Sequence, residues 1–278
     1  MEKIRKSIVA GSFYPQNPAI LETEIREFLA QANVPQKYNN CLGIISPHAG
    51  YFYSGQCAAY GFNAIKQKKF RRAVIIAPSH RFAGFKFSLG NYNFYQTPLG
   101  MLKVDKEFVN ELLKYEEFVF FEEAHYSEHS LEVQLPFLQI INPDATIVPI
   151  IFGNQNAENA VILANILKNA FAERLDETVF IISSDLSHYY DDETARKMDM
   201  RLVHYVKEQM IEELERDLQI RLVEACGFAG ILVLLHLAKE FHFEKVDTLH
   251  YSNSGDVNGD YSQVVGYLSS VIYSGGKE

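Results

Sequence analysis

The sequence predicts an α/β fold in which a mixed, mostly parallel central sheet is flanked by helices. Two observations indicate this fold. Short apolar runs alternate with longer segments that repeat an apolar residue every three or four positions, and the short runs end at turn signals. The 278 residues, 47% of them hydrophobic, are enough for a sizeable core. Because no linker or internal repeat divides the chain, we expect a single domain over residues 1–278.

The first half of the chain contains a strand–helix–strand unit. The run CLGIIS (41–46) is predicted as a strand, GQCAAYGFNAIKQ (55–67) as a helix and RAVIIAPS (72–79) as a second strand. Right-handed crossover connections make the two strands of such a unit parallel. We therefore expect these two strands to run in the same direction through the centre of the sheet.

The second half repeats this arrangement, with strands at 145–153 and 178–184 and a linking helix at 159–174. The remaining expected elements are helices over 192–210 and 226–241 and closing strands over 246–255 and 262–273. Apolar and polar residues alternate enough in the last strand to predict an antiparallel edge strand.

The composition favours a soluble cytoplasmic protein. The net charge is −9, from 26 Lys and Arg against 35 Asp and Glu, which argues against nucleic acid as the main partner. Three scattered cysteines are too few for a disulfide framework and indicate a reducing, intracellular setting. The N-terminal segment lacks the apolar stretch of a signal peptide. The most apolar run, 226–238, is shorter than the roughly 20 residues that span a bilayer, so we expect no membrane association.

Histidines follow three of the predicted parallel strands. His48 comes after strand 41–46, His80 after the second strand, and Asp185 and His188 after strand 178–183. Ligands of open α/β sheets bind outside the carboxyl ends of the strands, and neighbouring strands are only ~5 Å apart. Since imidazoles bind metals, three converging side chains with an open position predict a catalytic type of metal site. The other histidines outside the segment 122–137 are interpreted as packing or surface residues: His204, His236, His242 and His250.

The segment EEAHYSEHSLEVQLPF (122–137) adds two histidines, His125 and His129, beside a predicted helix start. His129 and Glu132 are three residues apart and would share a face of that helix. Two interpretations are open. The segment is an acidic helix start, or His129 lies over the site as an acid/base or a substrate-orienting group.

Cys226 opens the predicted apolar helix 226–241. The unpaired N–H groups and the dipole at a helix N-terminus favour the thiolate, so we expect a lowered thiol pKa. A thiolate is also a soft metal ligand. The alternative is a small buried residue before a glycine turn. Cys41 and Cys57, which lie inside a predicted strand and a predicted helix, are interpreted as core residues.

Seven segments together resemble one family. They are AGSFYP (10–15), SPHAGYFYSG (46–55), APSHR (77–81), EHSLEVQLPF (128–137), SSDLSHY (183–189), CGFAG (226–230) and SGDVNGDYSQVVGY (254–267). In combination they are similar to the Memo family, which is named for the mediator of ErbB2-driven cell motility and includes AmmeMemoRadiSam system protein B. The matching segments extend over essentially the whole chain.

The resemblance implies a fold similar to that of class III extradiol dioxygenases, which are non-haem iron enzymes that cleave catechol rings. It implies that His48 and His80 are metal ligands, and that Cys226 takes the place of the dioxygenase carboxylate ligand. The implied catalytic residues are His188 as the base, Asp185 close to it and His129 as the other pocket histidine. The implied partners are a radical-SAM protein and an AMMECR-type protein.

Two departures from the family pattern affect these implications. A cysteine in place of the carboxylate breaks the ligand triad that suits Fe(II) and O₂. We therefore expect a divalent or redox metal ion, with iron or copper favoured and zinc as the alternative. Vertebrate members carry an Arg-His pair after the Cys-Gly, where this chain has Phe228 and Ala229. Peptide recognition by those members is accordingly not carried over to this chain.

Three functions fit these patterns. The first is a metal-dependent redox or oxygenase-like protein of unknown substrate with His188 as general base. The second is a binding module for a phosphotyrosine-like or C-terminal peptide or a partner protein, in which Arg81 contacts an anion and aromatic residues form a rim. The third is a zinc-dependent hydrolase in which Asp185 or His188 activates water. The candidate pocket residues are Ser79, Arg81 and Tyr51, with Phe52 and Tyr53 beside the last.

Overall fold

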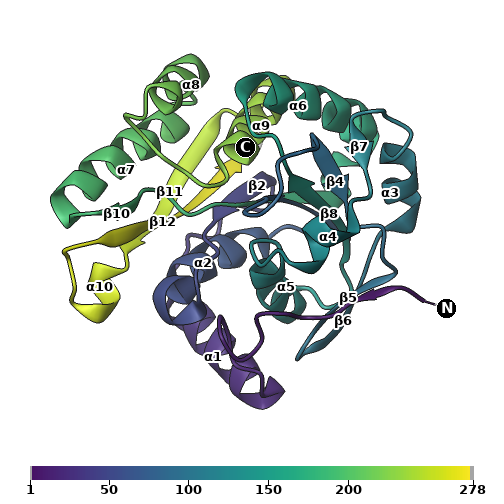
Figure 1. The fold of residues 1–278 in the computed structure, drawn as a ribbon, viewed down its shortest axis with the longest axis horizontal. Helices are drawn as coiled ribbons and strands as arrows, with labels where there is room; N and C mark the ends of the chain where they lie inside the picture. The colour runs from purple at the N-terminus through teal and green to yellow at the C-terminus, as the bar shows by residue number, and fades with distance from the viewer. Residues whose placement is uncertain (1, 276–278) are drawn as a thin grey trace.

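A large mixed sheet with helices on both faces forms the body of the protein, which confirms the predicted fold class (Figure 1). The computed structural model describes residues 2–275. Among these residues the large sheet has nine strands, in the order β10-β12-β2-β9-β3-β8-β4-β7, with β11 paired to β12. A smaller sheet of three strands has the order β1-β5-β6. None of the described helices is long and apolar enough to cross a membrane.

Four parallel strands form the centre of the large sheet: β2 (Cys41–Ser46), β9 (Thr178–Ser183), β3 (Arg72–Pro78) and β8 (Thr146–Phe152). Nearly all of their residues are buried, which explains the continuous apolar runs in the sequence. The two predicted crossovers interleave, because β9 lies between β2 and β3, and β3 lies between β9 and β8. The carboxyl ends of three strands that precede candidate residues therefore lie side by side.

The helices form layers on the two faces of the sheet. On one face α2 (Tyr51–Ile65) packs with α1 (Pro18–Gln31) and α5 (Leu135–Ile141), and on the other α6 (Ala157–Phe171) packs against α9 (Phe228–Glu240) (Figure 1). The other helical elements are α3 (Lys106–Leu112), α4 (Glu122–Tyr126), α7 (Asp192–Lys207), α8 (Ile211–Gln219), α10 (Gly255–Asn258) and the 3₁₀ helices η1 (Glu132–Gln134) and η2 (Ala172–Glu177).

The last strand, β12 (Val264–Tyr273), is antiparallel as predicted, but it is not an edge strand. It pairs with β11 (Lys245–Asn253) along one side, and with β2 and β10 (His188–Tyr190) along the other. Nine of its ten residues are buried, because helix α2 covers one face of the strand and α7 packs against it as well. The half-exposed strand β11 takes the edge position instead.

Several short elements have no clear signal in the sequence. They are the strands β1 (Ile4–Arg5), β4 (Phe87–Leu89), β5 (Phe94–Thr97), β6 (Gly100–Lys103) and β7 (Phe118–Val119). Each has two to four residues. β5 and β6 form a hairpin, whereas β1 pairs with β5, and β4 with β7 and β8, across long stretches of chain. Strands this short show no clear periodicity.

A buried ion pair holds the N-terminal segment against the rest of the protein. The guanidinium of Arg5 pairs with the carboxylate of Glu132, and both side chains are almost fully buried. The same carboxylate accepts hydrogen bonds from the hydroxyl of Tyr14 (2.5 Å) and from the backbone N–H of Val9 (3.1 Å). The prediction that His129 and Glu132 share a helix face is wrong, because His129 lies in a loop before η1 and Glu132 turns toward Arg5.

Candidate metal centre

Three histidines lie together at the carboxyl edge of the sheet. His48 follows β2 and His80 follows β3, whereas His129 comes from the loop between α4 and η1. One ring nitrogen of each histidine lies within 4.8 Å of the corresponding atom of the other two. The rings of His80 and His129 stack at 4.7 Å between centroids, and the ring of His48 stands edge-on to both. This arrangement can hold one metal ion.

Glu128 organises two of these three side chains. Its carboxylate accepts a hydrogen bond from the backbone N–H of His80 (2.7 Å) and faces the Nδ1 atom of the same residue at 2.9 Å. It also accepts from the backbone N–H groups of His129 (2.9 Å) and Ser130 (3.0 Å) and lies 3.3 Å from Nδ1 of His129. A carboxylate that accepts a hydrogen bond from Nδ1 keeps the imidazole proton on that nitrogen, so Nε2 has the lone pair that binds a metal. Both rings are thereby oriented for ligation.

The charges of these groups shift one another's pKa values. Burial acts to lower the pKa of His80, but the hydrogen bond and charge of Glu128 outweigh it, and the pKa is raised. Burial acts to raise the pKa of Glu128, but the hydrogen bond and charge of His80 lower it to about 2. Burial lowers the pKa of His129 despite the opposing charge of Glu128. Glu128 is therefore a fixed negative charge beneath two imidazoles.

His48 is held by a separate set of contacts. Its Nδ1 atom lies 2.8 Å from the hydroxyl oxygen of Ser183, and Gln134 donates to the same oxygen at 2.9 Å. The backbone N–H of His48 donates to Oδ1 of Asp185 (2.8 Å). Burial, together with the neighbouring histidines, lowers the pKa of the His48 imidazole, so the ring is neutral at neutral pH and able to donate a lone pair.

Cys226 lies next to His48, with its sulfur 3.2 Å from Nε2. The sulfur accepts the backbone N–H of Asp185 at 3.1 Å, and the backbone N–H of Cys226 donates to the carbonyl of Asp185 at the same distance. The expectation of a lowered thiol pKa is wrong. Burial raises the pKa, the negative charge of Asp185 adds to it, and helix α9 begins only at Phe228, beyond the N-cap Gly227.

Gly227 allows this close packing. A Cβ atom at this position would lie only 2.3 Å from the backbone oxygen of Ser183, at the end of β9. The backbone N–H of Gly227 donates to the hydroxyl of Ser184 (2.9 Å). Only a residue without a side chain brings the loop before α9, and with it Cys226, so near to the strand end.

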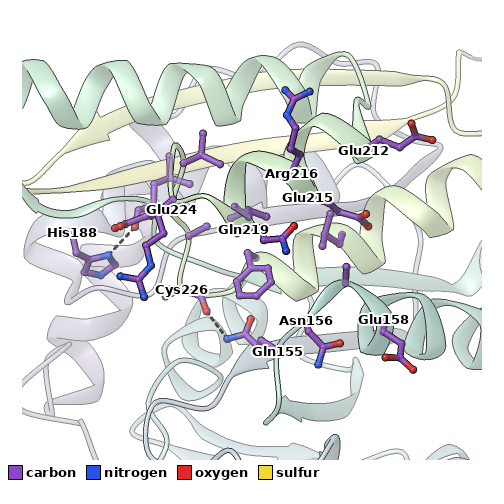
Figure 2. Close-up of a pocket in the computed structure, with 18 residues that line it drawn as sticks. Gln155, Asn156, Glu158, His188, Glu212, Glu215, Arg216, Gln219, Glu224 and Cys226 are labelled. Atoms are coloured by element: carbon purple, nitrogen blue, oxygen red, sulfur yellow. Dashed lines mark hydrogen bonds between the residues drawn. The ribbon is translucent and has the colours of Figure 1, made fainter.

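Asp185 and His188 lie near the three histidines but in different settings. Asp185 is buried, its pKa is raised by burial, and its carboxylate anchors the backbone of His48. His188 begins β10, and its Nδ1 atom lies 2.7 Å from the carbonyl oxygen of Leu186. Because that contact occupies Nδ1, Nε2 of His188 is the nitrogen available to exchange a proton. His188 and Cys226 both line a large cavity between α6, α8 and α9 (Figure 2).

The comparisons with known proteins agree with the resemblance seen in the sequence. A family model described as Memo-like protein matches residues 5–271. The chain belongs to the Memo-like family. MEMO1 family proteins of Thermoplasma volcanium and Methanocaldococcus jannaschii are each 36% identical to it, over 272 and 287 residues. These alignments cover 96% and 98% of this chain and 98% and 100% of the relatives.

A crystal structure of an uncharacterized protein from Escherichia coli K12 shares the fold of this Memo-like protein. The TM-score is 0.52 at 12% identity, and the match covers 84% of this chain and all of the other. At this level of identity the likeness supports the α/β architecture alone.

The three predicted pocket residues of this Memo-like protein have different surroundings. Tyr51 is 2% exposed and donates its hydroxyl to the carbonyl of Val133 (2.8 Å), so it belongs to the core and not to a rim. The hydroxyl of Ser79 accepts the backbone N–H of Phe82 at 3.1 Å and so shapes the turn that carries His80. Arg81 is exposed.

The remaining histidines and cysteines lie outside the three-histidine group. Cys41 and Cys57 are buried, as predicted. His204 is exposed on α7, and His250 stacks on Tyr60 at 4.6 Å between ring centroids. His125 is fully enclosed between Tyr95 and Ser88, with ring nitrogens 2.9 Å and 3.0 Å from their oxygens.

Sequence reasoning missed Glu128 and Ser183, which orient the histidine rings. Glu128 directly precedes His129, and Ser183 ends the strand before Asp185, so both lie within motifs that the sequence already marks. Acidic and hydroxyl residues beside candidate ligands are the signal that identifies such supporting groups.

Proposed function

We propose that this protein is a metal-dependent redox or oxygenase-like protein in which His48, His80 and His129 hold the metal. The observation that carries the proposal is the convergence of their ring nitrogens within 4.8 Å of one another. Three imidazoles with an open position are typical of catalytic metal sites, whereas structural sites are closed by a fourth protein ligand.

The donor chemistry fits a transition metal. The Nδ1 atoms of all three histidines have oxygen partners at 2.8–3.3 Å, which leaves the Nε2 atoms for the metal. Imidazole nitrogens suit iron, copper and zinc, and the neighbouring sulfur of Cys226 adds a soft donor that suits copper and zinc. Iron or copper is favoured for redox chemistry. The bound metal would supply a redox centre or a Lewis acid.

The protein's own residues provide positioning and proton transfer. Glu128 and Ser183 hold the imidazoles in place, and Asp185 fixes the loop after β2. His188 presents Nε2 beside the cavity that also reaches Cys226, so it can take or give a proton to a molecule bound there.

Metal analysis of protein purified without chelators or a histidine tag tests the proposal. We expect about one iron, copper or zinc ion per chain, lost in His48→Ala and kept in His204→Ala, which removes an exposed histidine on α7. Protein that lacks stoichiometric metal and takes none up on reconstitution would overturn the proposal.

Two further variants identify the third ligand. Loss of metal in His129→Ala with retention in Cys226→Ala supports the three-histidine set. The reverse result assigns Cys226 as the ligand, as the family resemblance implies, and leaves His129 as a pocket residue.

Zinc-dependent hydrolysis is the second candidate, because three histidines are also the ligand set with which zinc activates water. A paramagnetic signal from the native metal decides against it. The exposed Arg81, together with Phe52, which is 70% exposed, favours peptide binding as a third candidate. Binding of a phosphotyrosine peptide that survives complete metal removal would support that candidate over the other two.

A further inference from the structure

A cavity of about 910 Å³ lies beside the candidate metal centre. Its walls come from the start of α6, the length of α8, the loop before α9 and the first turns of α9. The volume is within the range of sites that enclose organic molecules of drug size, roughly 300–1,000 Å³. It is therefore large enough to hold the whole of such a molecule.

One end of this cavity lies beside the metal centre, although His48, His80 and His129 do not line it. Figure 2 shows His188 and Cys226 at the left end of the pocket, with Gln155 next to Cys226. The side chain of Gln155 donates to the carbonyl of Cys226 (2.8 Å) and accepts from the backbone N–H of Ala229 (3.3 Å), which ties α6 to the loop before α9. The sulfur of Cys226 is 3.2 Å from Nε2 of His48, so Cys226 connects this end of the cavity to the three-histidine group.

Apolar residues form part of the walls between the two ends. Seven of the lining residues are aliphatic or aromatic: Ala157, Leu186, Leu218, Val223, Ala225, Phe228 and Leu232. Leu218 and Phe228 are partly exposed, whereas Leu186, Val223 and Leu232 have almost no exposed surface. Such walls favour a ligand with an apolar body, since its burial removes nonpolar surface from water.

The charged groups of the lining carry a negative excess. Four carboxylates, Glu158, Glu212, Glu215 and Glu224, face two guanidinium groups, Arg216 and Arg221. Arg216 donates to the carboxylate of Asp217 at 3.0 Å, which neutralises its charge. Figure 2 shows that Glu158, Glu212 and Glu215 lie at the end away from His188 and Cys226. A cation is attracted to that end, and an anion is repelled.

We propose that this cavity binds an amphipathic organic amine. Its apolar body packs against Leu218 and Phe228, its positively charged nitrogen lies at Glu158, Glu212 and Glu215, and its other end reaches Cys226 and His188. This inference deepens the proposed function and rests on it only for the reactive role of the Cys226 end. The binding itself requires no metal.

Titration of the whole protein with three matched probes tests the proposal. Phenylbutylamine, phenylbutanol and phenylbutyrate share one apolar body and differ in the charge of the head group. Protein NMR measures the binding of each probe. We expect saturable binding that is tightest for phenylbutylamine and weakest for phenylbutyrate. The double variant Glu212→Gln/Glu215→Gln weakens the amine by about five- to tenfold and leaves the alcohol unchanged, because exposed ion pairs contribute modestly.

A matched control keeps the same change in net charge. Glu208→Gln/Glu213→Gln alters two carboxylates at the end of α7 and on α8 that do not line the cavity, and we expect no change in affinity.

Gln219→Trp, at an exposed position of the lining, blocks the cavity and abolishes binding of the amine and the alcohol. Equal loss in both double variants, binding unaffected by Gln219→Trp, or no binding of the amine would overturn the proposal. Carboxylate binding as tight as that of the amine would overturn it as well.

The same titration with His48→Ala separates this proposal from the proposed function. Amine binding that persists in this metal-free variant supports the cavity ligand whatever the metal analysis shows. Stoichiometric metal in a protein that binds none of the probes overturns the cavity proposal and leaves the metal centre intact.

Discussion

Replacing Glu128 with glutamine is the sharpest test of how the metal centre is held together. The carboxylate is 2% exposed and receives three backbone N–H groups, and it lies within 3.3 Å of Nδ1 of both His80 and His129. Glutamine keeps the shape but has one accepting oxygen, and its NH₂ group must face a donor. Glu128→Gln therefore removes a charge and leaves a buried donor without an acceptor.

The size of the effect follows from these contacts. An unsatisfied buried donor costs about 1–3 kcal/mol of folding free energy, which an otherwise stable domain tolerates. Loss of a carboxylate that orients metal-binding histidines lowers metal affinity by about 10- to 100-fold. In the metal-free protein, the pKa of His80 falls, because Glu128 raises it and burial alone lowers it.

Metal titration against a competing chelator measures the affinity, and NMR of the imidazole resonances measures the pKa of His80. Glu123→Gln, an exposed glutamate on α4, is the matched control and should change neither value. Unchanged metal affinity and an unchanged His80 pKa in folded Glu128→Gln protein would refute the role assigned to Glu128.

Three further predictions concern the surrounding structure. Gly227→Ala places a Cβ atom 2.3 Å from a backbone oxygen of β9, so we expect a loss of about 1–3 kcal/mol in thermal unfolding and a weakened metal site. Gly84→Ala, with no atom within 4 Å of its Cβ, should lack both effects. Glu132→Ala leaves Arg5 as an unpaired buried charge and should cost about 3–5 kcal/mol in urea unfolding. The double variant Arg5→Met/Glu132→Leu should recover most of that loss. A double variant as unstable as Glu132→Ala would contradict this account. Burial and the charge of Arg5 lower the pKa of His125 to about 3, while the unfolded chain takes up this proton as the pH falls through 6.5. Between those values the folded stability therefore decreases with falling pH by up to about 1.4 kcal/mol per unit, and His125→Gln should remove that part of the slope.

The sequence by itself determined the parallel core of the fold. Buried parallel strands contact neighbours on both faces, so they appear as continuous apolar runs, as in CLGIIS at 41–46 and TVFIIS at 178–183. The direction of each strand then places the residues that follow it at one edge of the sheet. His48 and His80 were located in this way, and the resemblance to the Memo family identified the same positions.

Tertiary structure decided which side chains meet. His129 joins the two strand-end histidines because Glu128 accepts the N–H of His80, which lies 48 positions away in the chain. His188 lies outside that group, because the chain turns after β9 to pair β10 with β12. These contacts depend on the order of the strands and on loops held by distant residues. Local periodicity reports burial along one segment, and it contains no information about the neighbours of that segment in space.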